Sequence, residues 1–344
     1  MSEKLRMGVI GCGAMGQAHL QVWESVATVR VAAVCDGSEQ RANETAARLG
    51  AIAFTSPKAM AESGLLDAVD VCTPSGLHAE QGIVCAQNNL HLLLEKPIDL
   101  NIKRVDALIE ECEDRGLTLA CMLQQRTFPV GQQVKAYIEA GHLGRLLSCS
   151  ASIKWWRSQD YYSSSAWRGT WEMDGGVLAN QGIHTLDMLC WLVGGVDEVE
   201  YAHLETANHA IQAEDNALAV LRFENGARGV IEATSCAYPD LCTRIEIVGT
   251  NGSVAFDGGN VVTFGFDGED RRGLLQSEVV DVGGGRSNPM AISLQAHTAI
   301  AEDFVQSIRE RREPLVSGRK ARVSLDALTK IYRKAFPNIV LGRE

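Results

Sequence analysis

The sequence has no run of apolar residues long enough to cross a membrane, which argues against a membrane-spanning protein. Positive charge is scarce too, because 43 acidic residues outnumber 32 Lys and Arg and give a net charge of −11. Without a basic stripe, no nucleic-acid partner is expected. The ten cysteines form no C-x-x-C pair and several lie in apolar runs, so we interpret them as buried reduced thiols of a cytoplasmic protein. The few residues before the first apolar run leave no room for a signal peptide.

The 344 residues exceed one ordinary hydrophobic core, and two domains are expected. An apolar run at residues 7–10 predicts a buried strand, and residues 17–25 suit a helix. Between them lies a G-x-G-x-x-G turn that consists of Gly11, Cys12, Gly13, Ala14, Met15 and Gly16. Gly11 allows the tight turn, Gly13 lets the backbone approach a pyrophosphate, and Gly16 lets helix and strand pack closely. Because the helix directs free N–H groups at phosphates, this stretch is predicted to bind a dinucleotide.

Asp36 indicates which dinucleotide binds. It follows the second predicted strand and lies about 20 residues beyond the last glycine, where a carboxylate accepts from ribose hydroxyls. A carboxylate also repels the 2′-phosphate of NADP, and Gly37 and Ser38 offer no adjacent cation to neutralise it. NAD is therefore favoured over NADP. Arg41 is a nearby cation, and we expect it on a solvated helix face.

Strands and helices alternate up to residue 123, which predicts an α/β fold with a parallel sheet covered by helices on both faces. Ligands bind such sheets at the carboxyl ends of the strands. Two predicted strands end there in Thr73-Pro74-Ser75 and in Glu95-Lys96-Pro97. Beyond the glycine turn and Asp36, the residues predicted to bind the cofactor are Thr73, Pro74, His78, Glu95 and Lys96.

From residue 124 the pattern changes to successive strands joined by short turns such as Glu224-Asn225-Gly226 and Asn251-Gly252. These hairpin signals predict a largely antiparallel sheet, accompanied by a helix at residues 177–193. The last of the expected strands covers residues 278–282. We expect helices on one face of this sheet, while an open apolar face favours a contact between subunits.

Two groups of side chains suit catalysis. Lys96 ends a buried strand at the cofactor edge, where it can hydrogen-bond a substrate hydroxyl or share its proton; the alternative is a surface lysine. On a helix, Asn180, His184 and Asp187 lie on one polar stripe. This stripe can face a substrate, with His184 as the acid or base. The alternatives are a satisfied core histidine and a metal pair of His184 and Asp187, and no metal is predicted because further ligands at metal spacing are lacking.

Residues 154–171 interleave aromatic rings with cations. Aromatic faces suit sugar rings, and Lys or Arg suits hydroxyls, carboxylates or phosphates. The alternative is a loop that packs between domains, and the serines at 163–165 lack the context of a hydrolase nucleophile. The residues predicted to bind substrate are Lys154, Tyr162, Trp167, Arg168, Asn180 and Asp187.

The sequence resembles the Gfo/Idh/MocA family, which includes glucose–fructose oxidoreductase and inositol dehydrogenase. The resemblance rests on the glycine turn, on Glu95-Lys96-Pro97, and on Gly175-Gly176 leading to Gly182-Ile183-His184 and Asp187. It implies an N-terminal Rossmann domain (1–123), an α/β domain with a large, mostly antiparallel open sheet (124–318), and a C-terminal helix (319–344) that returns to the first domain around Tyr332. It also implies NAD or NADP, a sugar or polyol substrate, Lys96 and His184 as the catalytic pair, and homodimers or homotetramers formed through the sheet.

The chain departs from inositol-dehydrogenase-like members, which carry an aspartate four residues before the histidine, where Asn180 stands here. Because an amide cannot take a proton, proton transfer falls to His184 with help from Lys96, and Asn180 orients the substrate. This version resembles members that oxidise the 3-hydroxyl of nucleotide-linked amino sugars. The predicted function is an NAD-dependent dehydrogenase acting on a secondary hydroxyl of a sugar, polyol or sugar derivative. The alternatives are an NAD-using glycosidase that works by transient oxidation and elimination, and a non-enzymatic, cofactor-sensing binding protein.

Overall fold

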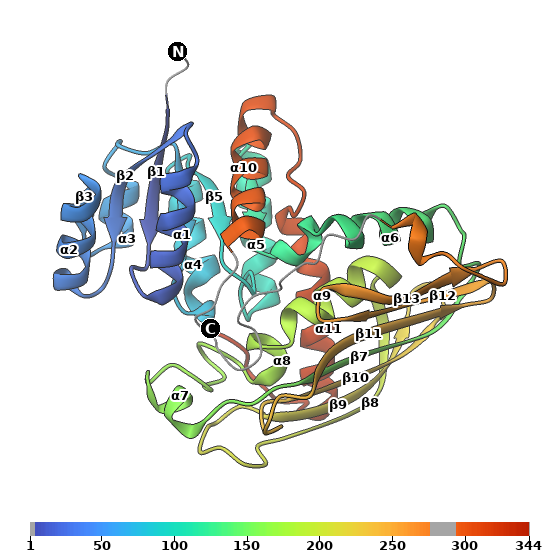
Figure 1. Cartoon of the computed structure of the whole chain (residues 1–344). Helices are drawn as coiled ribbons and strands as arrows, with labels where there is room; N and C mark the ends of the chain where they lie inside the picture. Colours follow the sequence, from blue (N-terminus) through green and yellow to red (C-terminus); the bar gives the residue numbers. More distant parts are fainter. Residues whose placement is uncertain (1–3, 276–293, 344) are drawn as a thin grey trace. The chain divides into compact units, whose positions relative to one another are not determined.

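The computed structural model describes residues 4–275 and 294–343, so the strand expected at residues 278–282 lies outside the described part. Contacts divide the chain into two compact units, which Figure 1 draws in the colours of the sequence. The first unit comprises residues 4–124, 294–322 and 343, and the second comprises 125–275 and 323–342. Among the helices described, none combines the length and apolar character needed to cross a membrane.

The first unit is built on a parallel six-stranded sheet with the order β3-β2-β1-β4-β5-β6. Its strands are β1 (Leu5–Ile10), β2 (Val29–Cys35), β3 (Ile52–Phe54), β4 (Ala68–Val71), β5 (His91–Leu94) and β6 (Leu119–Cys121). Its helices are α1 (Ala14–Ser25), α2 (Glu39–Leu49), α3 (Pro57–Ala61), α4 (His78–Gln87), α5 (Ile102–Asp114) and α10 (Leu294–Glu310). The central strands β1, β4 and β5 are almost entirely buried, as expected for a parallel sheet covered on both faces. The predicted Rossmann arrangement is therefore confirmed.

The second unit contains an eight-stranded sheet with the order β14-β13-β12-β11-β7-β10-β9-β8. Its strands are β7 (Leu146–Lys154), β8 (Val196–Glu205), β9 (Asn216–Phe223), β10 (Arg228–Thr234), β11 (Cys242–Gly249), β12 (Gly252–Asp257), β13 (Asn260–Phe266) and β14 (Glu269–Asp270). Its helices are α6 (Pro129–Glu139), α7 (Gln159–Ser163), α8 (Val177–Asn180), α9 (Ile183–Val193) and most of α11 (Gly318–Ala335). All neighbouring strands are antiparallel except β7 and β10, which confirms the mostly antiparallel sheet.

The two faces of this sheet differ in what covers them. Helix α9 packs on β7 and β11, and Figure 1 shows α8, α9 and α11 on the same side of the sheet. In β9 the inward residues alternate with outward ones, so Leu221 is fully buried whereas Leu218 is 41% exposed. Val230 and Val248 are likewise exposed on β10 and β11. The sheet therefore has one packed face and one face with apolar residues at the surface.

The helix predicted at residues 177–193 is two helices, α8 and α9. The break follows from Gly182, whose N–H donates to the carbonyl of Val177 at 2.7 Å and so skips the usual partner four residues back. A methyl group at Gly182 would also lie 3.1 Å from the backbone of Leu178. Asn180 therefore ends α8, whereas His184 and Asp187 belong to α9, and the single stripe that the sequence predicts is interrupted.

The C-terminal helices are divided between the two units. Helix α10 belongs to the first unit, where Phe304 meets the ring of Trp23 with centroids 6.5 Å apart. Helix α11 begins in the first unit and continues from residue 323 in the second. There the hydroxyl of Tyr332 donates to Glu214 at 2.9 Å, and both residues belong to the second unit.

Candidate active site

The glycine turn of the first unit meets three different steric demands. Gly11 has a φ of +97°, and a Cβ there would lie 2.6 Å from the carbonyl oxygen of Cys72. A Cβ on Gly16 would lie 1.8 Å from the carbonyl oxygen of Gly11, so helix α1 can pack here only with glycine. Next to Gly13, in contrast, no heavy atom lies within 4 Å. That open space beside the backbone fits the close approach of a pyrophosphate.

The start of helix α1 is prepared for an anion. Gly13 is the N-cap and has no side chain to cap the helix, and no acidic residue lies in the first turn, which begins at Ala14 and Met15. The first backbone N–H groups and the positive end of the helix dipole are therefore available to a phosphate. The residues around the turn thus fit a dinucleotide.

Asp36 is 8% exposed and accepts from the backbone N–H of Cys12 at 2.9 Å and of Ser38 at 2.7 Å. Arg41 donates to the same carboxylate at 2.8 Å, so Arg41 is paired with Asp36 instead of being only solvated, as the sequence had suggested. Burial opposes ionisation, but the hydrogen bonds from Arg41, Ser38 and Cys12 outweigh it and lower the pKa of Asp36. The carboxylate is ionised at neutral pH.

The loops after β4 and β5 are tied together by His78, which is 1% exposed. Its two ring nitrogens lie 2.8 Å from the carbonyl oxygens of Thr73 and Pro97. Pro74 and Thr73 form the start of the turn that leads into α4, and Thr73 donates to Gln81 at 2.8 Å. The geometry therefore favours a positioning role for His78 over the predicted direct contact with the cofactor.

In the second unit, the segment 174–190, described throughout, is buried at every position except Asn180 and His184. Asp174 holds the first of these: its carboxylate accepts from the side-chain amide of Asn180 at 2.5 Å and from the backbone N–H of Gly169 at 2.7 Å. His184 lies in the first turn of α9, one residue after Ile183. The two predicted site residues are thus the polar groups that this buried segment presents.

Asp187 has a different environment. Its two carboxylate oxygens accept from Arg126 at 2.6 and 2.7 Å, and the two side chains are 1% and 4% exposed. Because both oxygens are committed to this buried ion pair, the structure favours a structural role for Asp187 over the predicted substrate contact.

Tyr161, which is not among the predicted substrate-binding residues, contacts Asn180. Burial raises the pKa of Tyr161, while the charges of Arg168 and Arg157 and a hydrogen bond with Asn180 act in the opposite direction. Arg168 donates to the Tyr161 hydroxyl at 2.7 Å. The hydroxyl of Tyr162 instead contacts Ser235 at 2.8 Å, and its side chain is buried. Neighbouring tyrosines cannot be ranked from sequence, because only the direction of each ring separates them.

Arg168 is held by rings on both sides. Its guanidinium carbon lies 4.3 Å from the ring centroid of Tyr161 and 4.5 Å from that of Trp167. This stacking fixes the plane of the guanidinium group and favours its use in recognising a planar anion. Lys154 is paired with Glu232 at 2.8 Å, which raises its pKa, so its predicted substrate contact would compete with an ion pair across the sheet.

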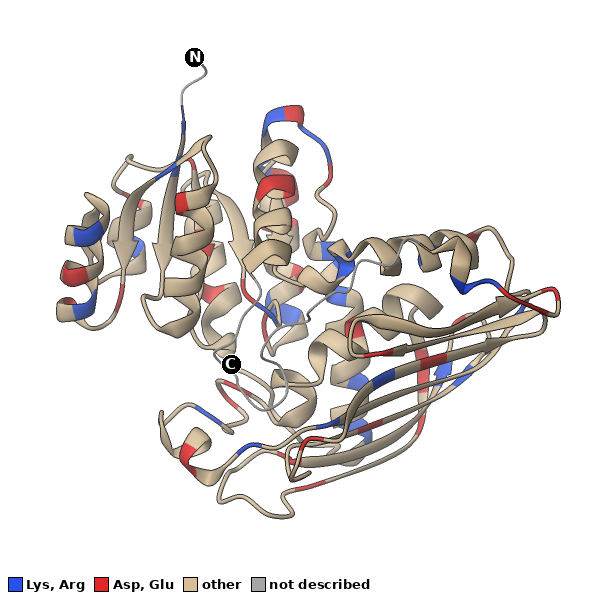
Figure 2. Cartoon of the chain, in the orientation of Figure 1, with Lys and Arg blue, Asp and Glu red and all other residues tan. Residues whose placement is uncertain are grey.

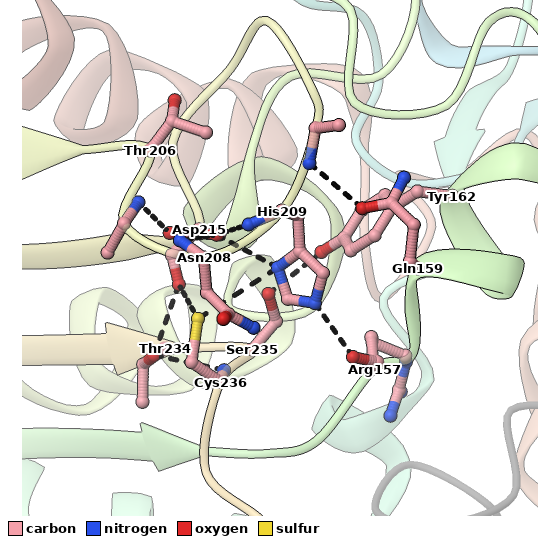
Figure 3. Close-up of polar contacts among 12 residues, drawn as sticks. Arg157, Gln159, Tyr162, Thr206, Asn208, His209, Asp215, Thr234, Ser235 and Cys236 are labelled. Carbon is pink, nitrogen blue, oxygen red and sulfur yellow. Dashed lines mark hydrogen bonds and ion pairs between the residues drawn. The ribbon is translucent and has the colours of Figure 1, made fainter.

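Figure 3 shows how the segment that carries these tyrosines is fastened. His209 lies between Asp215, 2.8 Å from Nδ1, and the carbonyl oxygen of Arg157, 2.8 Å from Nε2. Asp215 also accepts from three successive backbone N–H groups, at residues 207–209. These buried hydrogen bonds of His209 and Asp215 anchor the start of the segment 157–162 to the loop before β9.

Three groups of side chains have the residue types of metal ligands: His19–Asp70–Cys72, His19–Glu95–His297 and His209–Asp215–Cys236. In the described structure, the ring nitrogens of His19 and His209 already lie within hydrogen-bonding distance of oxygen atoms. These contacts explain the clusters as polar networks. His184 and Asp187, the pair weighed from sequence, belong to none of the three groups.

Comparison with known proteins identifies relatives of both units. A model of the family described as "Oxidoreductase family, NAD-binding Rossmann fold" matches residues 5–122, and one described as "GFO/IDH/MocA C-terminal domain" matches residues 132–255. The crystal structure of the WlbA dehydrogenase from Bordetella pertussis in complex with NADH and UDP-GlcNAcA is 31% identical, covers 99% of both chains and superposes with a TM-score of 0.86. Myo-inositol 2-dehydrogenase from Thermotoga maritima is 27% identical over 93% of each chain. Levoglucosan dehydrogenase from Pseudarthrobacter phenanthrenivorans is 28% identical over 79% of each.

Proposed function

The chain belongs to the Gfo/Idh/MocA family of NAD-binding oxidoreductases, and from this premise we propose that it oxidises a secondary hydroxyl of a sugar, polyol or sugar derivative. The relatives named above act on such compounds, which supports the substrate class. The glycine turn and Asp36 hold the NAD, and NAD, when bound, supplies the acceptor for a hydride. The substrate hydroxyl is handled by side chains of the chain itself.

The observation that carries the proposal is that, of residues 174–190, only Asn180 and His184 are not buried. His184 takes the proton of the hydroxyl, as a general base at neutral pH does. Lys96 hydrogen-bonds the same oxygen and stabilises the negative charge that develops on it. Asn180 cannot carry a proton, and its amide, held by Asp174, orients the substrate.

Arg168 supports a substrate that carries an anionic group. Its guanidinium is pre-oriented by Tyr161 and Trp167, and it donates to the Tyr161 hydroxyl that is linked to Asn180. A carboxylate or phosphate suits such a group. The relative from Bordetella pertussis binds UDP-GlcNAcA, which carries both. Within the broad class, we therefore favour a nucleotide-linked sugar oxidised at its 3-hydroxyl.

The decisive experiment measures NADH formation with purified protein, NAD and a panel of inositols, free aldoses, sugar acids and UDP-linked amino sugars. Reduction of NAD by one class is the expected result, and it names the substrate. NAD that binds tightly without net reduction on any compound would contradict the dehydrogenase. Release of free sugar from aryl glycosides would then indicate the NAD-using glycosidase.

Assembly and compartment belong to the same proposal. The open face of the sheet exposes Leu218, Val230 and Val248, which supports self-association into dimers or tetramers through this face. Figure 2 shows Lys and Arg mixed with Asp and Glu along the strands of this sheet. All ten cysteines, each within the described residues, are free thiols, and this supports a reducing compartment such as the cytoplasm.

A further inference from the structure

A buried polar cluster lies between helix α1 and the ends of strands β4 and β5 in the first unit. His19, on α1, is 1% exposed, and its Nδ1 lies 2.8 Å from a carboxylate oxygen of Asp70 on β4. Its Nε2 lies 2.9 Å from an oxygen of Glu95, directly after β5. Asp70 is fully buried and Glu95 is 5% exposed. One imidazole thus bridges two carboxylates that come from different strands.

The charges in this cluster are mutually dependent. A ring nitrogen that faces a carboxylate needs a proton to donate, so the two contacts require the imidazolium form of His19. Burial opposes the charge of His19, but Asp70 and Cys72 outweigh it and the pKa of His19 is raised well above its ordinary value. The remaining neighbours are Trp23, which donates to Asp70 at 2.6 Å, and His297 of α10, whose ring stands edge-on to that of His19 at 5.7 Å.

The second oxygen of Glu95 contacts Lys96, to which the proposed function assigns a catalytic role. It accepts from the backbone N–H of Lys96 at 2.9 Å, while the first oxygen is held by His19. Burial opposes ionisation of Glu95, but the hydrogen bond and charge of His19, with the charges of Lys96 and His297, outweigh it and lower the pKa of Glu95, so the carboxylate is ionised. Removing His19 would release one oxygen of Glu95, while the other oxygen still accepts from the backbone N–H of Lys96.

We propose that His19 is a positioning residue for the oxidation: by bridging Asp70 and Glu95, it fixes the carboxylate that orients Lys96. The inference rests on the proposed function, since Lys96 is assigned its role there. His19 also lies three residues after Gly16 on the helix whose start receives the dinucleotide. The side chains of His19 and Glu95 therefore connect that helix to the backbone of Lys96.

The test is His19→Gln, because glutamine is polar but uncharged and carries its N–H donors on one nitrogen, so it cannot replace the two separate ring nitrogens that face Asp70 and Glu95. With the substrate found in the panel, kcat is expected to fall about 10- to 100-fold, as for a misplaced catalytic group, while the Kd for NAD stays near that of the wild type. Trp23→Phe, which removes a donor to Asp70 but leaves His19 and Glu95 in contact, is the matched control.

Equal losses of kcat in His19→Gln and Trp23→Phe would overturn the inference. If His19→Gln does not fold, Glu95→Gln breaks the same bridge from its other end and is measured in its place. A readout without turnover separates this inference from the proposed function: reductive methylation of Lys96, followed by mass spectrometry relative to the exposed Lys58. The variant is expected to change the labelling rate of Lys96 even if no substrate is found, and an unchanged rate would contradict the bridge.

Discussion

The carboxyl group of Glu214 accepts a hydrogen bond from the hydroxyl of Tyr332 at 2.9 Å, and both side chains are fully buried. The same oxygen accepts from the backbone N–H of Leu178 at 3.0 Å, so Glu214 holds the first turn of α8. A Cβ on Gly176 would lie 1.9 Å from this carboxyl group, which leaves only glycine room there. Glu214 thus positions the short helix that ends at Asn180.

This arrangement makes stability depend on pH. Burial raises the pKa of Glu214 from an ordinary value of 4.5 to about 8, with a contribution from the charge of Asp174. Between these values the folded state keeps a proton that the unfolded state has lost. The stabilisation that comes from the proton on Glu214 is present in full below pH 4.5 and is lost as pH rises through about 8. The free energy of unfolding falls by up to about 1.4 kcal/mol per pH unit in this range.

Glu214→Gln is expected to flatten this slope, because the amide keeps an acceptor oxygen for Leu178 and Tyr332 but cannot ionise. The slope is measured by urea unfolding of both proteins at several pH values between about 5 and 9, which covers roughly the range in which Glu214 titrates. An identical pH dependence in the two proteins would show that Glu214 is ionised in the fold.

The glycine turn separates a folding requirement from a binding requirement. Gly16→Ala is expected to destabilise the first unit by about 1–3 kcal/mol or more, because its Cβ would overlap the Gly11 carbonyl. Gly13→Ala is expected to leave the melting temperature unchanged, since no heavy atom lies within 4 Å, and to raise the Kd for NAD at least about tenfold. Calorimetric melting and titration with NAD measure the two effects. If Gly13→Ala and Gly16→Ala changed the melting temperature and the Kd for NAD in the same way, the assignment of Gly13 to the pyrophosphate would be contradicted.

His184→Ala is expected to lower kcat about 10²–10⁴-fold, the usual loss when a general acid or base is removed. The matched control is His203→Ala, because His203 is an exposed histidine of β8 in the same unit. Steady-state NADH formation measures both, with NAD binding as a check of folding. Near-normal turnover in His184→Ala would contradict the role of His184 as the general base.

Arg168→Gln tests the anionic group of the substrate. Loss of a charged hydrogen bond of about 1.5–3 kcal/mol predicts an increase in KM of roughly 10- to 150-fold for substrates with a carboxylate or phosphate. Activity toward neutral polyols, where measurable, should be retained. Arg145→Gln, at an exposed arginine of the same unit, is the control. Equal KM changes for charged and neutral substrates would contradict anion recognition by Arg168.

Asp187→Asn is expected to cost about 3–5 kcal/mol of stability, because it leaves the buried Arg126 without its counter-charge. Enzyme that remains folded should keep its KM. Asp197→Asn, which breaks the half-exposed pair with Arg222, should change stability little. A raised KM of Asp187→Asn with little loss of stability would support the substrate contact that the sequence predicts for Asp187.

Much of the fold can be read from the sequence, because its signals are local. The three glycines, the buried strand that precedes them and Asp36 lie within one short stretch, and period-2 alternation with hairpin turns marks the second sheet. The steric limit at Gly16 is set by Gly11 within the same stretch, whereas the limit at Gly11 is set by Cys72 after β4, far away in the chain. The fold class and the NAD site were therefore predictable.

Tertiary structure alone decided the partners of the polar residues around the proposed site. Asp187 and Tyr162 have the composition of site residues but are committed to Arg126 and Ser235, whereas Tyr161 contacts Asn180. His19 and Glu214 carry no motif, and their roles come from partners 51 or more residues and 36 or more residues away in the chain, respectively. A buried polar group must find partners wherever the fold supplies them, and periodicity along the chain holds no information about such distant pairings.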